Sequence, residues 1–295
     1  MILASPCVGT CRLDDATGLC LGCARTGVEI AEWKDMSAAS RGAVWEVLPE
    51  RFERLGISGR RVGWTTEELR DFVRATLEDG GGTWTMGVIG GVAEFTALPG
   101  EAPQVERDGD DLIARVGAAR LRMRIDDDVR ALTFEPAGTP LEASRIVLAV
   151  KRSRPAPPVA QAVAALGPDA DALDPSDRGA RLYDLGLGRK DARFCLRVEA
   201  GAAETALRAA EGRAFGPALS RIGAAVLAES PPRVVETALG RIEVLAHIPP
   251  PGGQSPLGAH THLMPDHLAT GRTLPAGMDL PRAYRPGAMF YPPRV

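Results

Sequence analysis

Apolar residues recur at helical spacing in the N-terminal part of the chain. Ile30 and Trp33 fall on one face of a predicted helix. Thr26 and Glu29 precede that face with the spacing of a capping box, in which each side chain accepts a hydrogen bond from the other residue's backbone amide. The same spacing predicts further helices over residues 37–55, with a bend or restart at Pro49, and over residues 65–77.

The pattern changes after the glycine run at residues 80–82, where short apolar or alternating stretches replace the helical spacing. These stretches predict strands, with a few helices between them, and therefore an α+β fold with short antiparallel strands. The last forty or so residues are rich in proline and glycine, and we expect them to be mostly irregular. Strands are expected at 86–95, 112–116, 120–125, 129–134, 146–150, 182–187, 194–198, 234–237 and 242–246, and helices at 159–166, 204–214 and 218–228.

This change of pattern suggests a division into three parts. We expect a cysteine-containing module at residues 1–60, a helical linker at 61–82 and an α+β domain at 83–295. The length of 295 residues, with 45% hydrophobic and 25% charged residues, suits a folded chain of about two domains.

Charge and hydropathy exclude some classes of partner. The net charge of −3 provides no basic field for nucleic acid or anionic lipid, and no apolar run is long enough to span a bilayer. The first residues lack the basic and apolar regions of a secretory signal, so we expect a cytoplasmic protein.

Cysteine is concentrated at one end of the chain. In a reducing compartment, clustered thiols are typical metal ligands, whereas two disulfides or unligated thiols are the alternatives. Four thiolates can hold a zinc ion or an iron–sulfur cluster, and Arg12 and Arg25 can offset their negative charge. The pattern C-x3-C-x8-C-x2-C comprises four of the five cysteines: Cys7, Cys11, Cys20 and Cys23.

The residues around these cysteines form a wider pattern: Ser5-Pro6-Cys7, Cys11, Gly18-Leu19-Cys20, Gly22-Cys23, Arg25-Thr26, Glu29-Ile30, Trp33, Met36 and Leu48-Pro49. This stretch, residues 5–51, resembles a small four-cysteine bacterial family of unknown function described as predicted iron–sulfur proteins. The resemblance implies that the four cysteines are ligands of a metal or cluster, and it implies no reaction.

The histidines form a second candidate site near the C-terminus. His260 and His262 share one face if they lie in an extended strand, and His267 follows shortly after. They can share a zinc or iron ion with Glu243 or Asp266 as a further ligand, or act as acid–base groups. The alternative is that these imidazoles only bond buried backbone groups.

A second set of segments lies between residues 84 and 293: Trp84-Thr85-Met86-Gly87, Ala93-Glu94-Phe95, Leu166-Gly167-Pro168-Asp169, Tyr183-Asp184-Leu185-Gly186-Leu187-Gly188, Gly240-Arg241-Ile242-Glu243-Val244, Ser255-Pro256 and His260-Thr261-His262-Leu263. This set is similar to an uncharacterised group of bacterial proteins. Its most specific part is the last stretch, of the form SPxGxHTHL. The resemblance implies one structural unit and brings no activity.

These observations predict a metal-binding protein of unknown activity whose cysteine module holds zinc or an iron–sulfur cluster. Two alternatives remain open: a metal-dependent enzyme with a histidine site near residues 260–267, and a module that docks an unidentified protein partner. Cys195, which lies between apolar residues in a predicted strand, is expected to be buried and inert.

Overall fold

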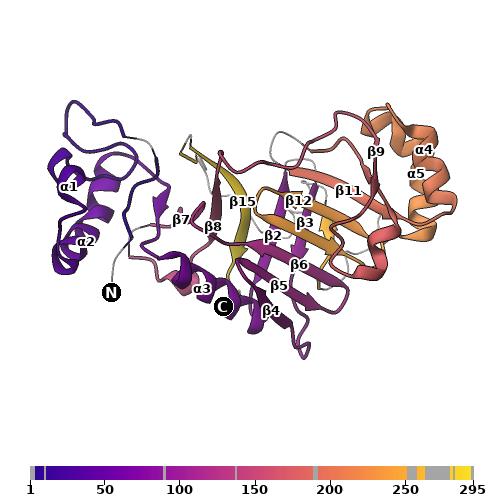
Figure 1. Ribbon diagram of the computed structural model, residues 1–295, viewed down its shortest axis with the longest axis horizontal. Helices are drawn as coiled ribbons and strands as arrows, with labels where there is room; N and C mark the ends of the chain where they lie inside the picture. The colour runs from indigo at the N-terminus through magenta and orange to yellow at the C-terminus, as the bar shows by residue number, and fades with distance from the viewer. Residues whose placement is uncertain are drawn as a thin grey trace.

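The computed structural model describes residues 4–9, 11–88, 91–136, 138–188, 192–250, 258–262, 280–281 and 283–293. Its helices lie at the two ends of the molecule and along one side of the strands (Figure 1). They are α1 (Gly27–Glu32), α2 (Ala38–Arg54), α3 (Thr66–Glu78), α4 (Ala202–Ala210) and α5 (Phe215–Glu229), with short 3-10 helices η1 (Leu141–Ala143) and η2 (Pro175–Gly179).

The strands of the described chain form two sheets, of seven and eight strands, and all of their pairings are antiparallel. The fold is therefore α+β, as predicted. The seven-stranded sheet has the order β1 (Arg60–Arg61), β7 (Val129–Thr133), β8 (Ile146–Lys151), β15 (Tyr284–Tyr291), β2 (Thr83–Val88), β3 (Gly91–Phe95) and β14 (Thr261–His262). The eight-stranded sheet has the order β4 (Gln104–Asp108), β5 (Asp111–Val116), β6 (Ala119–Arg124), β13 (Gly240–Val244), β12 (Arg233–Thr237), β11 (Ala192–Val198), β10 (Arg181–Asp184) and β9 (Ala164–Pro168).

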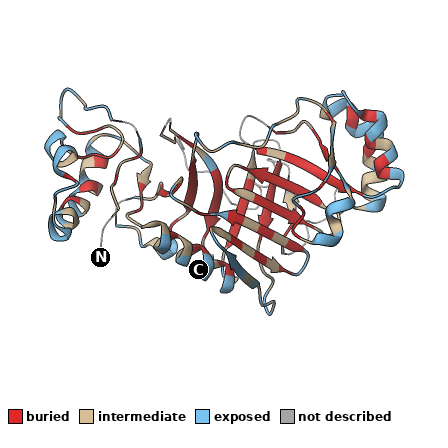
Figure 2. Ribbon diagram, in the orientation of Figure 1, coloured by how far each residue is buried: buried red, intermediate tan, exposed pale blue. Residues whose placement is uncertain are grey.

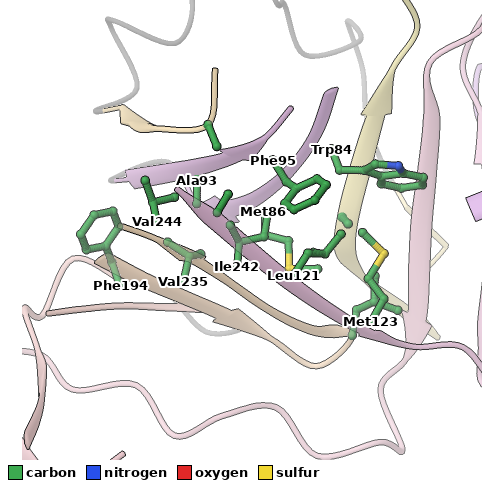
Figure 3. Close-up of a cluster of buried hydrophobic side chains, with 14 of the residues drawn as sticks. Trp84, Met86, Ala93, Phe95, Leu121, Met123, Phe194, Val235, Ile242 and Val244 are labelled. Carbon is green, nitrogen blue, oxygen red and sulfur yellow. The ribbon is translucent and has the colours of Figure 1, made fainter. Parts of the chain in front are cut away.

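The main core lies between the two sheets. Strands β2 and β3 of the first sheet contact β11, β12 and β13 of the second. Figure 3 shows side chains of both sheets meeting, among them Trp84 and Phe95 from the first and Leu121 and Ile242 from the second. Burial of these apolar faces is the main source of stability that the structure offers, and most of the strands are accordingly buried in Figure 2.

The cysteine module has a small core of its own. Trp33 packs with Val44, Leu48 and Phe52 of α2. The predicted capping box at the start of α1 is formed, because Thr26 accepts a hydrogen bond from the backbone of Glu29 and Glu29 accepts one in return. Helix α3, which is capped in the same way, instead packs its apolar face on the main core.

One expected helix is absent. The region 159–166 forms no helix: its end belongs to β9, which pairs with β10 at the edge of the eight-stranded sheet. Backbone pairing with a neighbouring strand there outweighs the helical preference of its alanines. Helix α2 runs from Ala38 to Arg54 without a restart at Pro49.

Strands β15 and β4 are among those that the sequence pattern did not predict. Strand β15 lies inside the seven-stranded sheet, between β8 and β2, although its region was expected to be irregular. Pro286 falls at a break in its register with β8, where a missing amide hydrogen is tolerated. Strand β4 is polar and mostly exposed, so it has no apolar alternation to reveal it.

Within the described residues, no helix combines the length and apolar character needed to cross a membrane.

Candidate functional site

The cysteine loop is held by backbone hydrogen bonds that fold it back on itself. The amide of Cys20 donates to the carbonyl of Arg25 at 2.8 Å, and the amide of Ala24 donates to the carbonyl of Cys20 at 2.7 Å. An isolated bridge pairs Leu13 with Cys20, which brings the two halves of the loop together. Gly18 turns the chain between them with a φ of 67°, a conformation that glycine adopts readily.

The same sulfur contact occurs at the first cysteine of each pair. The backbone amide of Gly9 donates to Sγ of Cys7, and that of Gly22 donates to Sγ of Cys20, both at 3.4 Å. In each case the donor is the glycine two residues after the cysteine. Hydrogen bonds of this kind stabilise the thiolate form, which is the form that binds metals.

The cysteines of the two pairs affect one another electrostatically: Cys7 and Cys20 both act to raise the pKa of Cys11. No disulfide joins cysteines in the described part of the chain.

The surroundings of the loop shift the pKa values of three of its thiols. The charge of Cys7 raises the pKa of Cys11, helped by desolvation and by Cys20. Burial raises the pKa of Cys23 to about 11, against the opposing effect of Arg25. Burial also acts to raise the pKa of Cys20, but hydrogen bonds from Gly22 and Cys23 outweigh it and hold the pKa below its usual value. These surroundings therefore favour the neutral thiol at Cys11 and Cys23 and the thiolate at Cys20.

The donor set fits a sulfur-liganded metal, since four thiols share a short loop and two of them accept amide hydrogen bonds. In the described residues, no group of three or more histidine, cysteine, aspartate or glutamate side chains is already arranged to hold an ion. Convergence of all four sulfurs on one centre therefore stays a prediction.

Arg25 supplies positive charge at the sulfurs. Its side chain is 3% exposed, its Nε donates to Sγ of Cys23 at 3.4 Å, and its guanidinium lies 4.7 Å from the ring centre of Trp33. No carboxylate of the described chain forms an ion pair with it. Arg12, the other expected counter-charge, is exposed.

The loop is also fastened to the seven-stranded sheet. Arg61 of β1 donates to the carbonyl of Ser5 and, at 3.2 Å, to that of Cys7. Val8 packs in an apolar cluster on the outer face of that sheet, with residues that include Tyr284 and Leu132. Burial lowers the pKa of Arg61 to about 10. The first cysteine pair is thus positioned by the sheet as well as by its own loop.

Three large apolar side chains are exposed in the described part of the module: Leu13 is 47% exposed, Val28 63% and Val47 38%. Leu13 lies beside Gly27, next to Val28 in the chain. A set of this size is ordinary for a protein surface and does not by itself favour partner docking.

The histidine segment is described only in part. The backbone carbonyl of His260 accepts the amide of Glu94 at 2.8 Å, and its Nδ1 lies 2.7 Å from the carbonyl of Gly258. His262 pairs with Val92 in the strand register. His267 and Asp266 lie outside the described residues, so a second metal site with His260, His262 and His267 stays a prediction.

Glu243 is not available to this segment. Ile242 and Val244 face the main core, so Glu243 between them points to the opposite face of its sheet. There its carboxylate lies 2.9 Å from Nη1 of Arg197 and 3.1 Å from Nε of Arg241. The expectation that Glu243 serves as a ligand with the histidines is therefore wrong.

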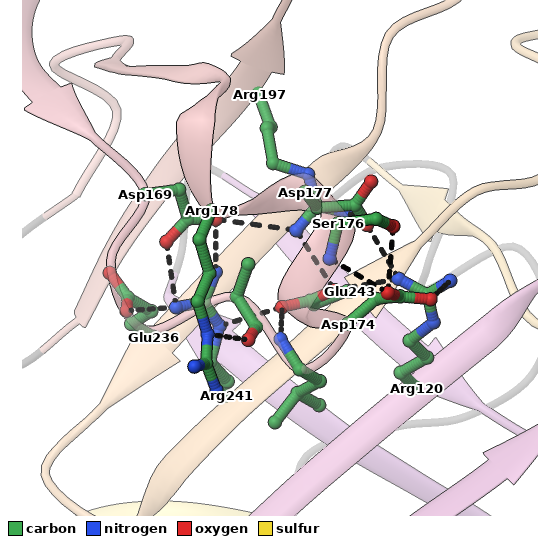
Figure 4. Close-up of polar contacts among 12 residues, drawn as sticks. Arg120, Asp169, Asp174, Ser176, Asp177, Arg178, Arg197, Glu236, Arg241 and Glu243 are labelled. Atoms are coloured by element: carbon green, nitrogen blue, oxygen red, sulfur yellow. Dashed lines mark hydrogen bonds and ion pairs between the residues drawn. The ribbon is translucent and has the colours of Figure 1, made fainter.

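Sequence reasoning missed the buried ion network to which Glu243 belongs (Figure 4). Arg241 forms two hydrogen bonds to Asp169, at 2.7 and 3.0 Å, and Arg197 reaches Asp177 at 2.7 Å. The side chains of Arg197, Arg241, Asp169 and Glu243 are at most 2% exposed. Burial opposes the charge of Arg241, but Asp169 and the other carboxylates raise its pKa. Since each charge has opposite partners, the network holds the segment of Asp169 and η2 on the sheet.

The signal for this network was present in the sequence. Arg241 and Glu243 alternate with apolar residues in one strand, and Arg197 stands between apolar neighbours in another. Asp169 and the Gly240–Val244 segment both belong to the second resemblance, and the structure brings them into contact. Cys195, by contrast, is fully buried in β11 as expected, and burial raises its pKa.

Comparison with known proteins adds two family matches. The model described as "Family of unknown function (DUF6925)" matches residues 68–295. The model described as "Protein of unknown function (DUF1289)" matches residues 5–52. Neither a curated protein nor a solved structure matches the chain. The two matches agree with a small N-terminal module fused to a larger domain.

We expect Glu243→Gln to lower the free energy of unfolding by about 3 kcal/mol, because it leaves Arg197 and Arg241 buried with too little negative charge. Denaturant unfolding measures the loss, with exposed Glu199→Gln as the control. Equal stability of the two variants would show that the network contributes little.

Proposed function

The chain belongs to the family of unknown function DUF6925, and we propose that it is a metal-binding protein whose N-terminal module holds zinc or an iron–sulfur cluster. The proposed ligands are Cys7, Cys11, Cys20 and Cys23. The proposal concerns the module matched at residues 5–52 and assigns no reaction to the larger domain.

The observation that carries the proposal is the repeated amide–sulfur contact. Gly9 bonds Cys7 and Gly22 bonds Cys20 at the same distance and the same sequence offset. Such donors lower the cost of a negative sulfur and orient it, which is what a metal ligand requires.

The charge around the sulfurs supports the same conclusion. Four thiolates with one divalent ion carry a net charge of about −2, which is costly to bury without nearby cations. Arg25 is buried against Cys23, and Arg61 is buried against the backbone of Cys7. Arg25 has no ion-pair partner among the described carboxylates, so the loaded centre would be its counter-charge.

The residues present suit zinc and iron alike, because both accept a set of four thiolates. When bound, zinc would crosslink the loop, whereas an iron–sulfur cluster would add one-electron transfer. In either case the chain's own task is to present four ionised sulfurs, to supply positive charge through Arg25, and to hold the loop on the sheet through Arg61.

We expect protein purified without oxygen to carry one zinc ion or one cluster per chain, and Cys11→Ser to lose most of it. Cys11 is exposed, so its replacement should leave the fold intact. Elemental analysis gives the metal content, and visible absorption separates a cluster from zinc.

The matched control is Cys195→Ala, which removes a thiol outside the module. A wild-type protein that folds normally without metal would contradict the proposal. So would a Cys11→Ser variant that holds as much metal as Cys195→Ala.

We expect Arg25→Gln to weaken zinc binding about 10- to 100-fold, the usual effect of losing a group that bonds a metal ligand. Competition with a chelator of known affinity measures the change. Arg41→Gln is the control, because Arg41 also lies over Trp33, at 5.6 Å, but is bonded to the carbonyls of Trp33 and Lys34. Equal affinities in the two variants would assign Arg25 a packing role only.

A further inference from the structure

A cavity of about 200 Å³ lies where the module meets the sheet. One wall is the apolar side of α2, with Trp45 and Phe52. The other is the edge of the seven-stranded sheet, with Arg60 and Arg61 of β1. Ligand sites are common at such junctions between structural units.

The walls of this cavity are apolar and basic. None of the described residues that line it carries a carboxylate. Arg60 is bonded to the carbonyls of Glu135 and Pro136, and Arg61 to those of Ser5 and Cys7. Neither guanidinium has a carboxylate within ion-pair distance among the described residues.

Arg61 also keeps an unused donor here. Arg61 is 8% exposed and therefore more than nine-tenths buried. Its Nε has no hydrogen-bond partner in the described chain. A buried donor of this kind is costly unless something accepts its hydrogen bond. An anionic acceptor would satisfy both the donor and the two positive charges.

We propose that this cavity, the Arg60–Arg61 pocket, binds the carboxylate of a small organic acid that has an apolar body. The guanidiniums would hold the carboxylate, and the apolar body would lie against Trp45 and Phe52. An apolar cavity of about 150 Å³ holds benzene, so the volume suits one aromatic ring or a branched chain of similar size with its acid group. Arginine favours carboxylates because its fork of donors matches their two oxygens.

The test uses 4-fluorobenzoate and the full-length protein as purified. Fluorine NMR of the ligand should show saturable binding with a dissociation constant of about 1 mM, as expected for so small a molecule. The uncharged analogue 4-fluorobenzyl alcohol should bind at least about tenfold more weakly, because it lacks the charge-assisted hydrogen bonds.

Two variants locate the binding. Arg60→Gln should weaken it at least about fivefold, whereas Arg54→Gln, the same charge change at an exposed position of α2, should leave it unchanged. Thr139→Trp, which fills the cavity and keeps both arginines, should abolish it. The proposal fails if the wild type does not bind at about 10 mM ligand, if the alcohol binds as well as the acid, or if either cavity variant binds like Arg54→Gln.

Discussion

The burial of two antiparallel sheets against each other is the constraint on which the rest of this structure depends. The inner faces supply the apolar side chains of the core, such as Trp84 and Leu121. Charged residues that alternate with these apolar side chains are directed to the outer faces, where those that are buried need a partner. On the eight-stranded sheet the partners are other side chains, and the result is the network of Arg197, Arg241 and Glu243. On the seven-stranded sheet, Arg61 of β1 bonds backbone carbonyls of the cysteine module.

This arrangement explains why the module is attached as it is. Arg61 leaves the edge strand β1 and bonds carbonyls at Ser5 and Cys7, while Val8 covers the outer face near Tyr284. The module has its own small core, and within the module Nε1 of Trp45 donates to the carbonyl of Ala4 at 3.1 Å. The proposed metal centre and the Arg60–Arg61 pocket both lie at this junction.

Local features of the structure could be read from the sequence. The capping box of Thr26 and Glu29, and the hairpins β5–β6 and β12–β13, depend on residues close together in the chain. Arg25 was identified as a counter-charge because it follows Cys23 closely. Arg61 was not, since 54 residues separate it from Cys7 and only the sheet brings them together. Asp169 and Arg241 are 72 residues apart, so their contact could not be predicted either. Strand β15 was not predicted because it contains a proline, which lies at a break in its register with β8. The division of the chain at residues 60 and 82, and the histidine site, stay predictions.

X-ray absorption at the metal edge tests the central claim most directly, because it counts the atoms bound to the metal. For the protein as purified, the account predicts a first shell of four sulfur atoms at about 2.3 Å for zinc, or sulfur neighbours together with a nearby iron for a cluster. A first shell made only of nitrogen and oxygen at about 2.0 to 2.1 Å would contradict it, because the metal would then be bound away from the four cysteines.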